Sequence, residues 1–145
     1  MRPYQPADEA AVVALWVRCG LTRPWNDPRN DIARKLVVRP DLFLVAEMDG
    51  AVVGTVVVGY DGHRGWINYL GVDPGCRRRG VGRALMAEAE RLLRLEGCPK
   101  INLQVRTSNT DAIEFYRRVG YALDDVVSLG RRLEADGPGS GAKPP

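Results

Sequence analysis

The fold is decided by one stretch of the sequence, Tyr69-Leu-Gly-Val-Asp-Pro-Gly-Cys-Arg77-Arg-Arg-Gly80-Val-Gly82-Arg-Ala-Leu85. It predicts a strand that ends near Val72, a basic loop rich in glycine, and a helix that begins at Gly80. A helix start leaves backbone N–H groups without partners and carries a partial positive charge, so it attracts anions. Gly80 and Gly82 lack the Cβ that would hold a phosphate away from these groups. The stretch therefore predicts a pyrophosphate-binding loop.

Three arginines, Arg77, Arg78 and Arg79, add positive charge to this loop and offer charge-assisted hydrogen bonds. The loop differs from two better-known phosphate loops. The run from Gly80 to Leu85 lacks the third glycine of the dinucleotide fingerprint, and the chain has no Gly-Lys-Ser/Thr sequence. The alternative interpretation is a solvated turn in which the glycines only let a strand meet a helix.

The flanking sequence alternates between strand and helix patterns. We expect strands at residues 1–6, 42–48, 51–60, 66–72, 101–105 and 121–133, and helices at 8–20, 30–38, 80–96 and 111–119. Asp49-Gly50 predicts a hairpin between residues 42–48 and 51–60, which should pair antiparallel. This order predicts an α+β (mixed α/β) domain with a largely antiparallel sheet and helices packed on it.

The composition limits the domain count and the location. A length of 145 residues fits one domain, which we place at residues 1–133, followed by a flexible tail rich in glycine and proline at residues 134–145. No apolar run approaches the ~18 residues that a membrane span needs, and no leader pattern stands at the N-terminus. We therefore expect a cytoplasmic protein without a membrane partner.

Charge and cysteine content exclude further classes. A formal net charge of +3 is too small to require a nucleic-acid partner. Cys19, Cys76 and Cys98 are odd in number and contain no Cys-x-x-Cys pair, which argues against a disulfide framework and a zinc cluster. We expect reduced thiols and no bound metal.

Two motifs in this chain resemble those of the GNAT superfamily of acyl-CoA N-acyltransferases. Arg77-x-x-Gly80-x-Gly82 is similar to its pyrophosphate motif, and Asn109-x-x-Ala112-x-x-Phe115-Tyr116-x-x-x-Gly120-Tyr121 resembles its second, C-terminal motif. The resemblance runs from about Arg2 to Leu133. Three segments also resemble a bacterial subgroup named YpeA: Arg23-Pro-Trp-Asn-Asp-Pro28, Tyr60-Asp-Gly-His-Arg-Gly65 and Gly97-Cys-Pro-Lys100. The resemblance implies a central, mostly antiparallel twisted sheet with helices on both faces.

The resemblance also implies an activity, namely direct transfer of an acetyl group from acetyl-CoA to a primary amine. It implies that Val72 and Tyr116 are catalytic, because the Val72 N–H would face the thioester oxygen and the Tyr116 hydroxyl would protonate the departing thiolate. On periodicity alone, the favoured interpretation of Tyr116 is a core or rim aromatic residue on an amphipathic helix. The residues that the resemblance assigns to the cofactor are Leu70, Gly71, Val72, Arg77, Arg78, Arg79, Gly80, Val81, Gly82, Arg83, Asn109 and Tyr116.

The resemblance does not supply a general base. Trp66 and Asn68 stand at strand positions where some family members carry a Glu or His base, and Gln104 stands where protein N-terminal acetyltransferases often have a Glu. None of the three is a carboxylate, which weakens the analogy with ribosomal-protein acetylation. A water-relayed proton path is one alternative, and each of the remaining candidates also fits a structural role in a turn or at a strand end. These candidates are Glu47, Asp61 and His63.

Other interpretations stay open at this level. The chain would also fit a non-catalytic acyl-CoA-binding sensor or partner module, whereas a nucleic-acid-binding domain lacks support because no aromatic residues interleave with the arginine run. Trp25, in a loop bounded by prolines, would either shape the acceptor pocket or plug the core. The acceptor would be a peptide, an aminoglycoside, a polyamine, an amino acid or another small amine. A homodimer is compatible with the resemblance.

Overall fold

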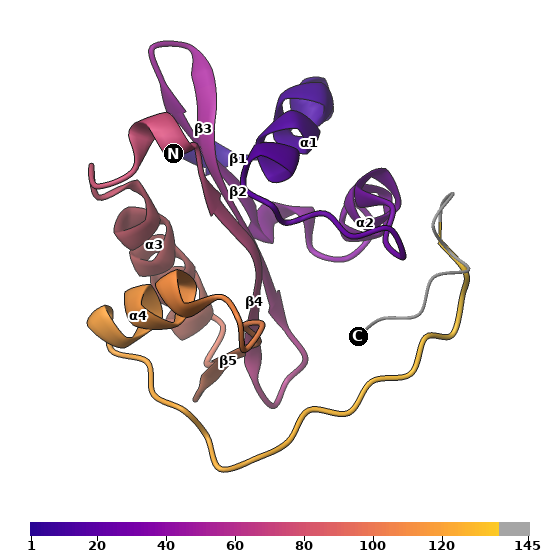
Figure 1. The fold of residues 1–145 in the computed structure, drawn as a ribbon, viewed down its shortest axis with the longest axis vertical. Helices are drawn as coiled ribbons and strands as arrows, with labels where there is room; N and C mark the ends of the chain where they lie inside the picture. Colours follow the sequence, from indigo (N-terminus) through magenta and orange to yellow (C-terminus); the bar gives the residue numbers. More distant parts are fainter. Residues whose placement is uncertain (137–145) are drawn as a thin grey trace.

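The computed structural model describes residues 1–136. Its helices and strands follow one another as β1 (Arg2–Pro3), α1 (Glu9–Arg18), α2 (Pro28–Lys35), β2 (Phe43–Met48), β3 (Ala51–Tyr60), β4 (Gly65–Val72), α3 (Val81–Leu95), β5 (Ile101–Leu103) and α4 (Thr110–Arg118) (Figure 1). Short 3-10 turns lie at Pro6–Asp8, Pro40–Leu42 and Pro74–Cys76. Within these residues, no helix is long and apolar enough to cross a membrane.

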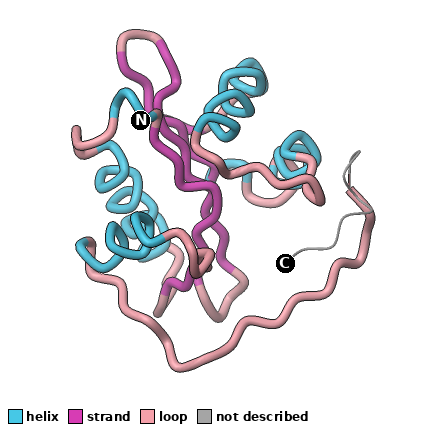
Figure 2. Tube along the Cα trace, in the orientation of Figure 1, coloured by secondary structure: helices cyan, strands magenta, loops and turns pink. Residues whose placement is uncertain are grey.

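The strands, drawn in magenta in Figure 2, form one sheet. Their order in the sheet is β1-β2-β3-β4-β5. β1, β2, β3 and β4 pair antiparallel with one another. Asp49-Gly50 closes the expected hairpin between β2 and β3. β5 lies parallel to β4 because α3 returns the chain to the edge of the sheet at which β4 begins. The predicted mostly antiparallel sheet is confirmed.

Helices cover both faces of the sheet, as predicted. Figure 1 shows α1 and α2 on one face and α3 and α4 on the other. Alternation along the strands explains this, because successive side chains point to opposite faces. Phe43 and Val45 of β2 join the core under α1 and α2, whereas Leu44 and Ala46 join the core under α3. Each face therefore has its own apolar cluster.

A β-bulge interrupts β4 near the middle of the sheet. Val57 pairs with Asn68 and Thr55 pairs with Gly71, so two residues of β4, Tyr69 and Leu70, lie opposite one residue of β3. Tyr69 has a φ of 51°, in the left-handed region that costs a non-glycine residue about 1 to 3 kcal/mol. The ladder between β4 and β5 ends at Ile67 and Leu103, just before the bulge. The two strands separate beyond that point.

Three buried contacts hold Tyr69 in this conformation. The indole ring of Trp16 stacks on the Tyr69 ring, with 3.8 Å between the ring centroids. The Trp16 Nε1–H donates to the hydroxyl oxygen of Thr55 at 2.9 Å. That hydroxyl in turn donates to the Tyr69 carbonyl oxygen at 2.8 Å. These contacts offset the local strain and fix the direction of the Tyr69 side chain.

The predicted strand at residues 121–133 is wrong. The described part of this segment contains no strand, and Val127 and Leu129 are 84% and 92% exposed. An alternating apolar sequence becomes a strand only when a neighbouring strand supplies backbone hydrogen bonds, and none pairs with it here. Figure 1 shows residues 121–136 running from the end of α4 across to α2.

Several boundaries also differ from the prediction: α1 and α2 end earlier than expected, and β5 ends at Leu103 rather than at residue 105. The tail lies mostly outside the described residues. The first strand is only Arg2–Pro3, and α2 begins earlier than expected because the Asp27 side chain accepts the Arg29 N–H at 2.9 Å and caps the helix. Of the predicted tail at residues 134–145, residues 137–145 are outside the described part of the chain.

Candidate active site

A cleft of about 1670 Å³ opens where β4 and β5 separate. One wall comes from β4 and α2, and the other comes from the chain after β5, from α4 and from the start of the C-terminal segment. Of the residues predicted for the cofactor site, Leu70, Asn109 and Tyr116 line this cleft. The structure therefore brings together residues from β4 and α4 that are more than a quarter of the chain apart.

Tyr116 projects from α4 into an aromatic group. Its ring packs edge-on against Phe115 and Tyr121, at centroid distances of 5.3 Å and 5.9 Å. Burial raises the pKa of the Tyr116 hydroxyl to about 12. The hydroxyl is therefore protonated at neutral pH and has a proton to donate to a group in the cleft.

Asn109 and Val72 lie at the ends of two elements that line the cleft: Asn109 precedes α4, and Val72 is the last residue of β4. The Asn109 side-chain oxygen accepts the Ala112 N–H at 3.2 Å and so caps α4. The Val72 carbonyl accepts the Cys19 thiol at 3.3 Å and Arg77 Nε at 3.4 Å. Gly71 is required for a further reason, because a Cβ there would lie 2.9 Å from the Leu21 side chain. Gly71, Val72 and the basic loop are next to the cleft in the chain but do not line it.

The basic loop ends at the start of α3 in a conformation suited to an anion. Gly80 is the N-cap, with a φ of 78°, and a Cβ built there meets no atom within 4 Å. The first turn of α3 has no acidic residue and the cap offers no side-chain acceptor, so the N–H groups at the helix start have no anionic partner within the described residues. In residues 1–136, Arg77, Arg78 and Arg79 form no ion pair.

Gly82 has a packing role that the sequence does not reveal. A Cβ at Gly82 would lie 3.3 Å from the Phe115 ring and 3.5 Å from the Val72 side chain. The glycine therefore lets α3 approach α4 and the end of β4 closely. Gly80, rather than Gly82, is the glycine that leaves open space at the loop.

Comparison with known proteins decides the family. The sequence matches the Acetyltransferase (GNAT) family over residues 10–121. It is also 51% identical over 136 residues to an acetyltransferase of Pectobacterium atrosepticum, covering 94% of this chain and 96% of that protein. The chain belongs to the GNAT family. This similarity along nearly the whole chain is also compatible with the predicted YpeA-like subgroup.

Solved structures agree with the GNAT assignment. The crystal structure of Ard1 from Thermoplasma volcanium has a TM-score of 0.74 and 32% identity, and the match covers 85% of this chain and 82% of Ard1. Naa20 of Chaetomium thermophilum, solved with a bisubstrate analogue, has a TM-score of 0.68 and 26% identity, covering 83% of this chain and 70% of that one. The protein is a GNAT N-acetyltransferase.

The predicted base candidates of this GNAT domain lie outside the lining of the cleft. Glu47 accepts Arg2 Nε at 2.8 Å. Asp61 accepts the N–H groups of His63 and Arg64 at 2.8 Å and 2.7 Å, which lowers its pKa below the ordinary value. These contacts give Glu47 and Asp61 structural roles in an ion pair and a turn.

The cleft contains a carboxylate that sequence reasoning missed. Asp31 of α2 accepts the Tyr69 hydroxyl at 2.5 Å and Arg34 at 2.8 Å. In the sequence, Asp31 resembles an ordinary acidic residue in the first turn of a helix, so no local signal identifies it.

Trp25, the predicted acceptor-side residue, packs against an arginine. The Arg106 guanidinium carbon lies 5.3 Å from the centroid of the Trp25 ring.

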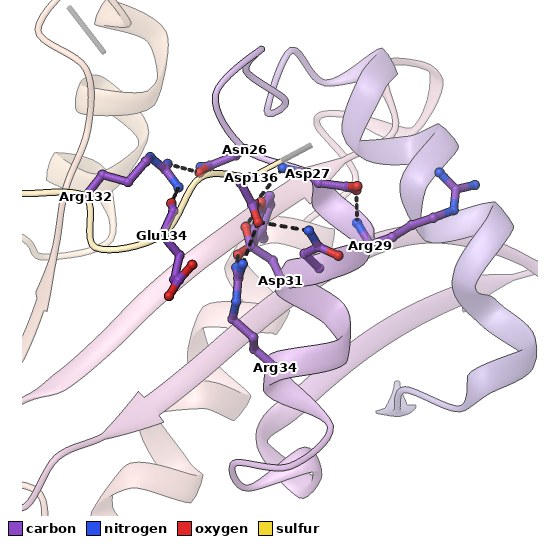
Figure 3. Close-up of polar contacts among 10 residues, drawn as sticks. Asn26, Asp27, Arg29, Asp31, Arg34, Arg132, Glu134 and Asp136 are labelled. Atoms are coloured by element: carbon purple, nitrogen blue, oxygen red, sulfur yellow. Dashed lines mark hydrogen bonds and ion pairs between the residues drawn. The ribbon is translucent and has the colours of Figure 1, made fainter. Parts of the chain in front are cut away.

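The C-terminal segment is attached to α2 by a buried carboxylate. Asp136 is 1% exposed and accepts the Asp27 N–H, Asn30 Nδ2 and Arg34 at 2.9, 2.9 and 2.6 Å (Figure 3). These hydrogen bonds lower the pKa of Asp136 to about 2. A segment without backbone pairing is thus held at this end by one side chain.

We expect Asp136→Asn to lower the melting temperature at pH 7, because the charge-assisted bonds to α2 are lost. The pKa of Asp136 is lower in the folded state, from 3.8 to about 2, so its stabilisation is present above pH 3.8 and disappears as the pH falls toward 2. In thermal unfolding between pH 7 and pH 2, the difference in melting temperature between the variant and the wild type should shrink as the pH falls from 3.8 toward 2. Asp125→Asn, the same change on an exposed residue, is the control. A difference that does not vary with pH would contradict this assignment.

Proposed function

We propose that this cytoplasmic GNAT enzyme transfers the acetyl group of acetyl-CoA directly to a primary amine. The observation that carries the proposal is that Tyr116 and the backbone at Leu70, beyond the end of the ladder between β4 and β5, line one cleft. The start of α3, with no acidic residue in its first turn, follows Leu70 in the chain after three arginines. A thioester on a long arm that leads to a pyrophosphate would use both features.

The residues present fit acetyl-CoA. The backbone of Leu70, Gly71 and Val72, freed from β5, would pair with the pantetheine arm, and Asn109 would lie near it. The loop would bind the pyrophosphate through its N–H groups and side chains. The residues proposed for this contact are Arg77, Arg78, Arg79, Gly80, Val81, Gly82 and Arg83.

The thioester supplies an activated acetyl group, and the protein controls charge around it. The Val72 N–H would stabilise the negative charge on the carbonyl oxygen, an effect of about 100-fold to 1000-fold in related acyl transfers. The amine nitrogen forms a bond to the carbonyl carbon while the C–S bond breaks. The departing thiolate takes a proton from the Tyr116 hydroxyl, which is protonated at neutral pH.

The first test is calorimetric titration with acetyl-CoA. We expect Gly80→Glu to weaken binding at least about 10-fold, because a carboxylate at the helix start repels the pyrophosphate. Gly97→Glu is the matched control, since Gly97 follows the other end of α3 and has the same open space and a φ of 82° against 78°. Acetyl-pantetheine, which lacks the pyrophosphate, should bind both variants alike.

Two results would argue against this function. If Gly80→Glu and Gly97→Glu weaken acetyl-CoA binding equally, backbone strain rather than the loss of a pyrophosphate contact explains the effect. Absence of acetyl-CoA binding to the wild-type protein would remove the cofactor assignment. Release of free thiol from acetyl-CoA in the presence of an amine, measured on the same preparation, separates an enzyme from a sensor.

A further inference from the structure

Asp31 and Tyr69 form a pair on the α2 and β4 side of the cleft. The Tyr69 hydroxyl donates to Asp31 Oδ2 at 2.5 Å, and Arg34 donates to Oδ1 at 2.8 Å. The Asp31 side chain is 28% exposed and lines the cleft together with Tyr69. A carboxylate has about four acceptor positions, so two remain for a ligand. Asp31 is therefore both anchored and accessible.

The bulge places this pair beside the backbone proposed for the thioester. Tyr69 directly precedes Leu70, and its left-handed φ of 51° is held by Trp16 and Thr55. Backbone strain of this kind is retained where the surrounding structure enforces it, and such residues cluster at functional sites. The pair thus has a fixed position relative to Leu70 and Val72.

The other carboxylates that line the cleft have different partners. Glu90 of α3 accepts the Tyr121 hydroxyl at 2.9 Å. Asp124 accepts Lys100 at 3.0 Å and the Asn102 side chain at 2.6 Å, on the opposite wall. Among the described lining residues, Asp31 is the carboxylate that lies next to the bulge.

An amine acetyltransferase needs a base or a water path that takes a proton from its substrate. An alkyl amine is a cation at neutral pH and becomes a nucleophile only after it loses a proton. A carboxylate attracts the cation, and hydrogen bonds from Tyr69 and Arg34 fix its orientation. Neither Glu47 nor Asp61 lines the cleft.

We propose that Asp31 binds the ammonium group of a cationic primary amine and takes the proton that this amine loses before it attacks the thioester. The proposal rests on the proposed function and names its acceptor class. The N–H bond breaks and the proton passes to Asp31 and then to water. The nitrogen lone pair forms the N–C bond and the C–S bond breaks. The thiolate receives the Tyr116 proton, and the second amine proton restores Tyr116.

The neighbouring charges are compatible with this role. Arg34 lies between Asp31 and Asp136 and donates to both (Figure 3). Arg34 thereby fixes the Asp31 side chain beside Tyr69. The attraction for a cationic acceptor comes from the Asp31 carboxylate itself, which lines the cleft.

The experiment compares two probe acceptors in the full-length protein with acetyl-CoA at pH 7. 1-Aminobutane is a cation at this pH, whereas O-methylhydroxylamine is uncharged and needs no deprotonation before attack. We expect Asp31→Asn to lower kcat/KM about 100-fold for 1-aminobutane while the value for O-methylhydroxylamine stays within about 3-fold. Asp124→Asn, a carboxylate of the same cleft on the opposite wall, should leave the ratio of the two unchanged.

Tyr69→Phe tests whether Asp31 binds the acceptor or only anchors α2. It removes the hydrogen bond between Tyr69 and Asp31 but keeps the Asp31 carboxylate. It should keep the preference for 1-aminobutane that Asp31→Asn loses. An equal loss of kcat/KM for both amines in Asp31→Asn would overturn the proposal and give Asp31 a structural role. The same change of amine preference in Asp31→Asn and Tyr69→Phe would also overturn it. Failure of the wild-type protein to acetylate either amine would instead contradict the proposed function, and the proposal would fall with it.

Discussion

Tyr116→Phe is expected to lower kcat about 1000-fold with little effect on acetyl-CoA binding. Tyr116 lines the cleft, and burial raises the pKa of its hydroxyl to about 12, so the hydroxyl carries a proton at neutral pH. Phenylalanine keeps the ring and its packing against Phe115 and Tyr121 but has no proton for the thiolate. A thiolate that leaves without this proton is a poorer leaving group, so the loss should appear in kcat. Steady-state release of free thiol measures it.

The control for this prediction is Tyr121→Phe. It removes a hydroxyl from the same aromatic group, one that donates to Glu90 at 2.9 Å. Its effect on kcat should stay within about 5-fold, because the Tyr121 hydroxyl is not the proposed proton donor. Equal losses in the two variants would mean that the aromatic group acts only through packing. Full activity of Tyr116→Phe would show that another group protonates the thiolate.

Trp16→Ala is expected to lower the free energy of unfolding by about 4 kcal/mol. Trp16 is 1% exposed, and its ring stacks on Tyr69 at 3.8 Å and on Phe43 at 6.1 Å. Alanine leaves a cavity between α1 and the sheet and removes the hydrogen bond from Nε1 to the buried Thr55 hydroxyl at 2.9 Å. Urea denaturation at pH 7 measures the change.

Val17→Ala is the control for this core substitution, because Val17 is the next residue of α1 and is 59% exposed. Its effect should stay within about 0.5 kcal/mol. A loss for Trp16→Ala of about 1 kcal/mol or less would contradict the view that this ring supports the bulge.

Local signals in the sequence predicted much of the fold. Asp49-Gly50 closes a hairpin, and the strand, basic loop and helix from Tyr69 to Leu85 lie where the pattern placed them. These features depend on neighbours within a few residues: positive φ at Gly50 and Gly80, and an apolar face on α3. The loop residues that we propose for the cofactor are contiguous, so their spacing is visible before folding.

The predicted strand at residues 121–133 shows where local signals end. Its apolar alternation is real, but backbone pairing requires a partner at the right distance, and the sequence of one segment carries no information about that partner. In the structure, Ser128 contacts Gln104 and Asp136 contacts α2 through side chains instead. The segment is therefore held by polar groups that lie far from it in the chain.

The sequence alone determined the family motifs, the mostly antiparallel sheet, the position of the basic loop and Tyr116 as a candidate. The position of Asp31 beside the bulge of β4 in the cleft depends on the folded chain. Asp31 and Tyr69 are 38 residues apart, and they meet because Trp16, Thr55 and the bulge of β4 turn Tyr69 toward α2. A side chain acquires its chemical role from neighbours that packing brings to it, and packing of this kind depends on the whole core at once.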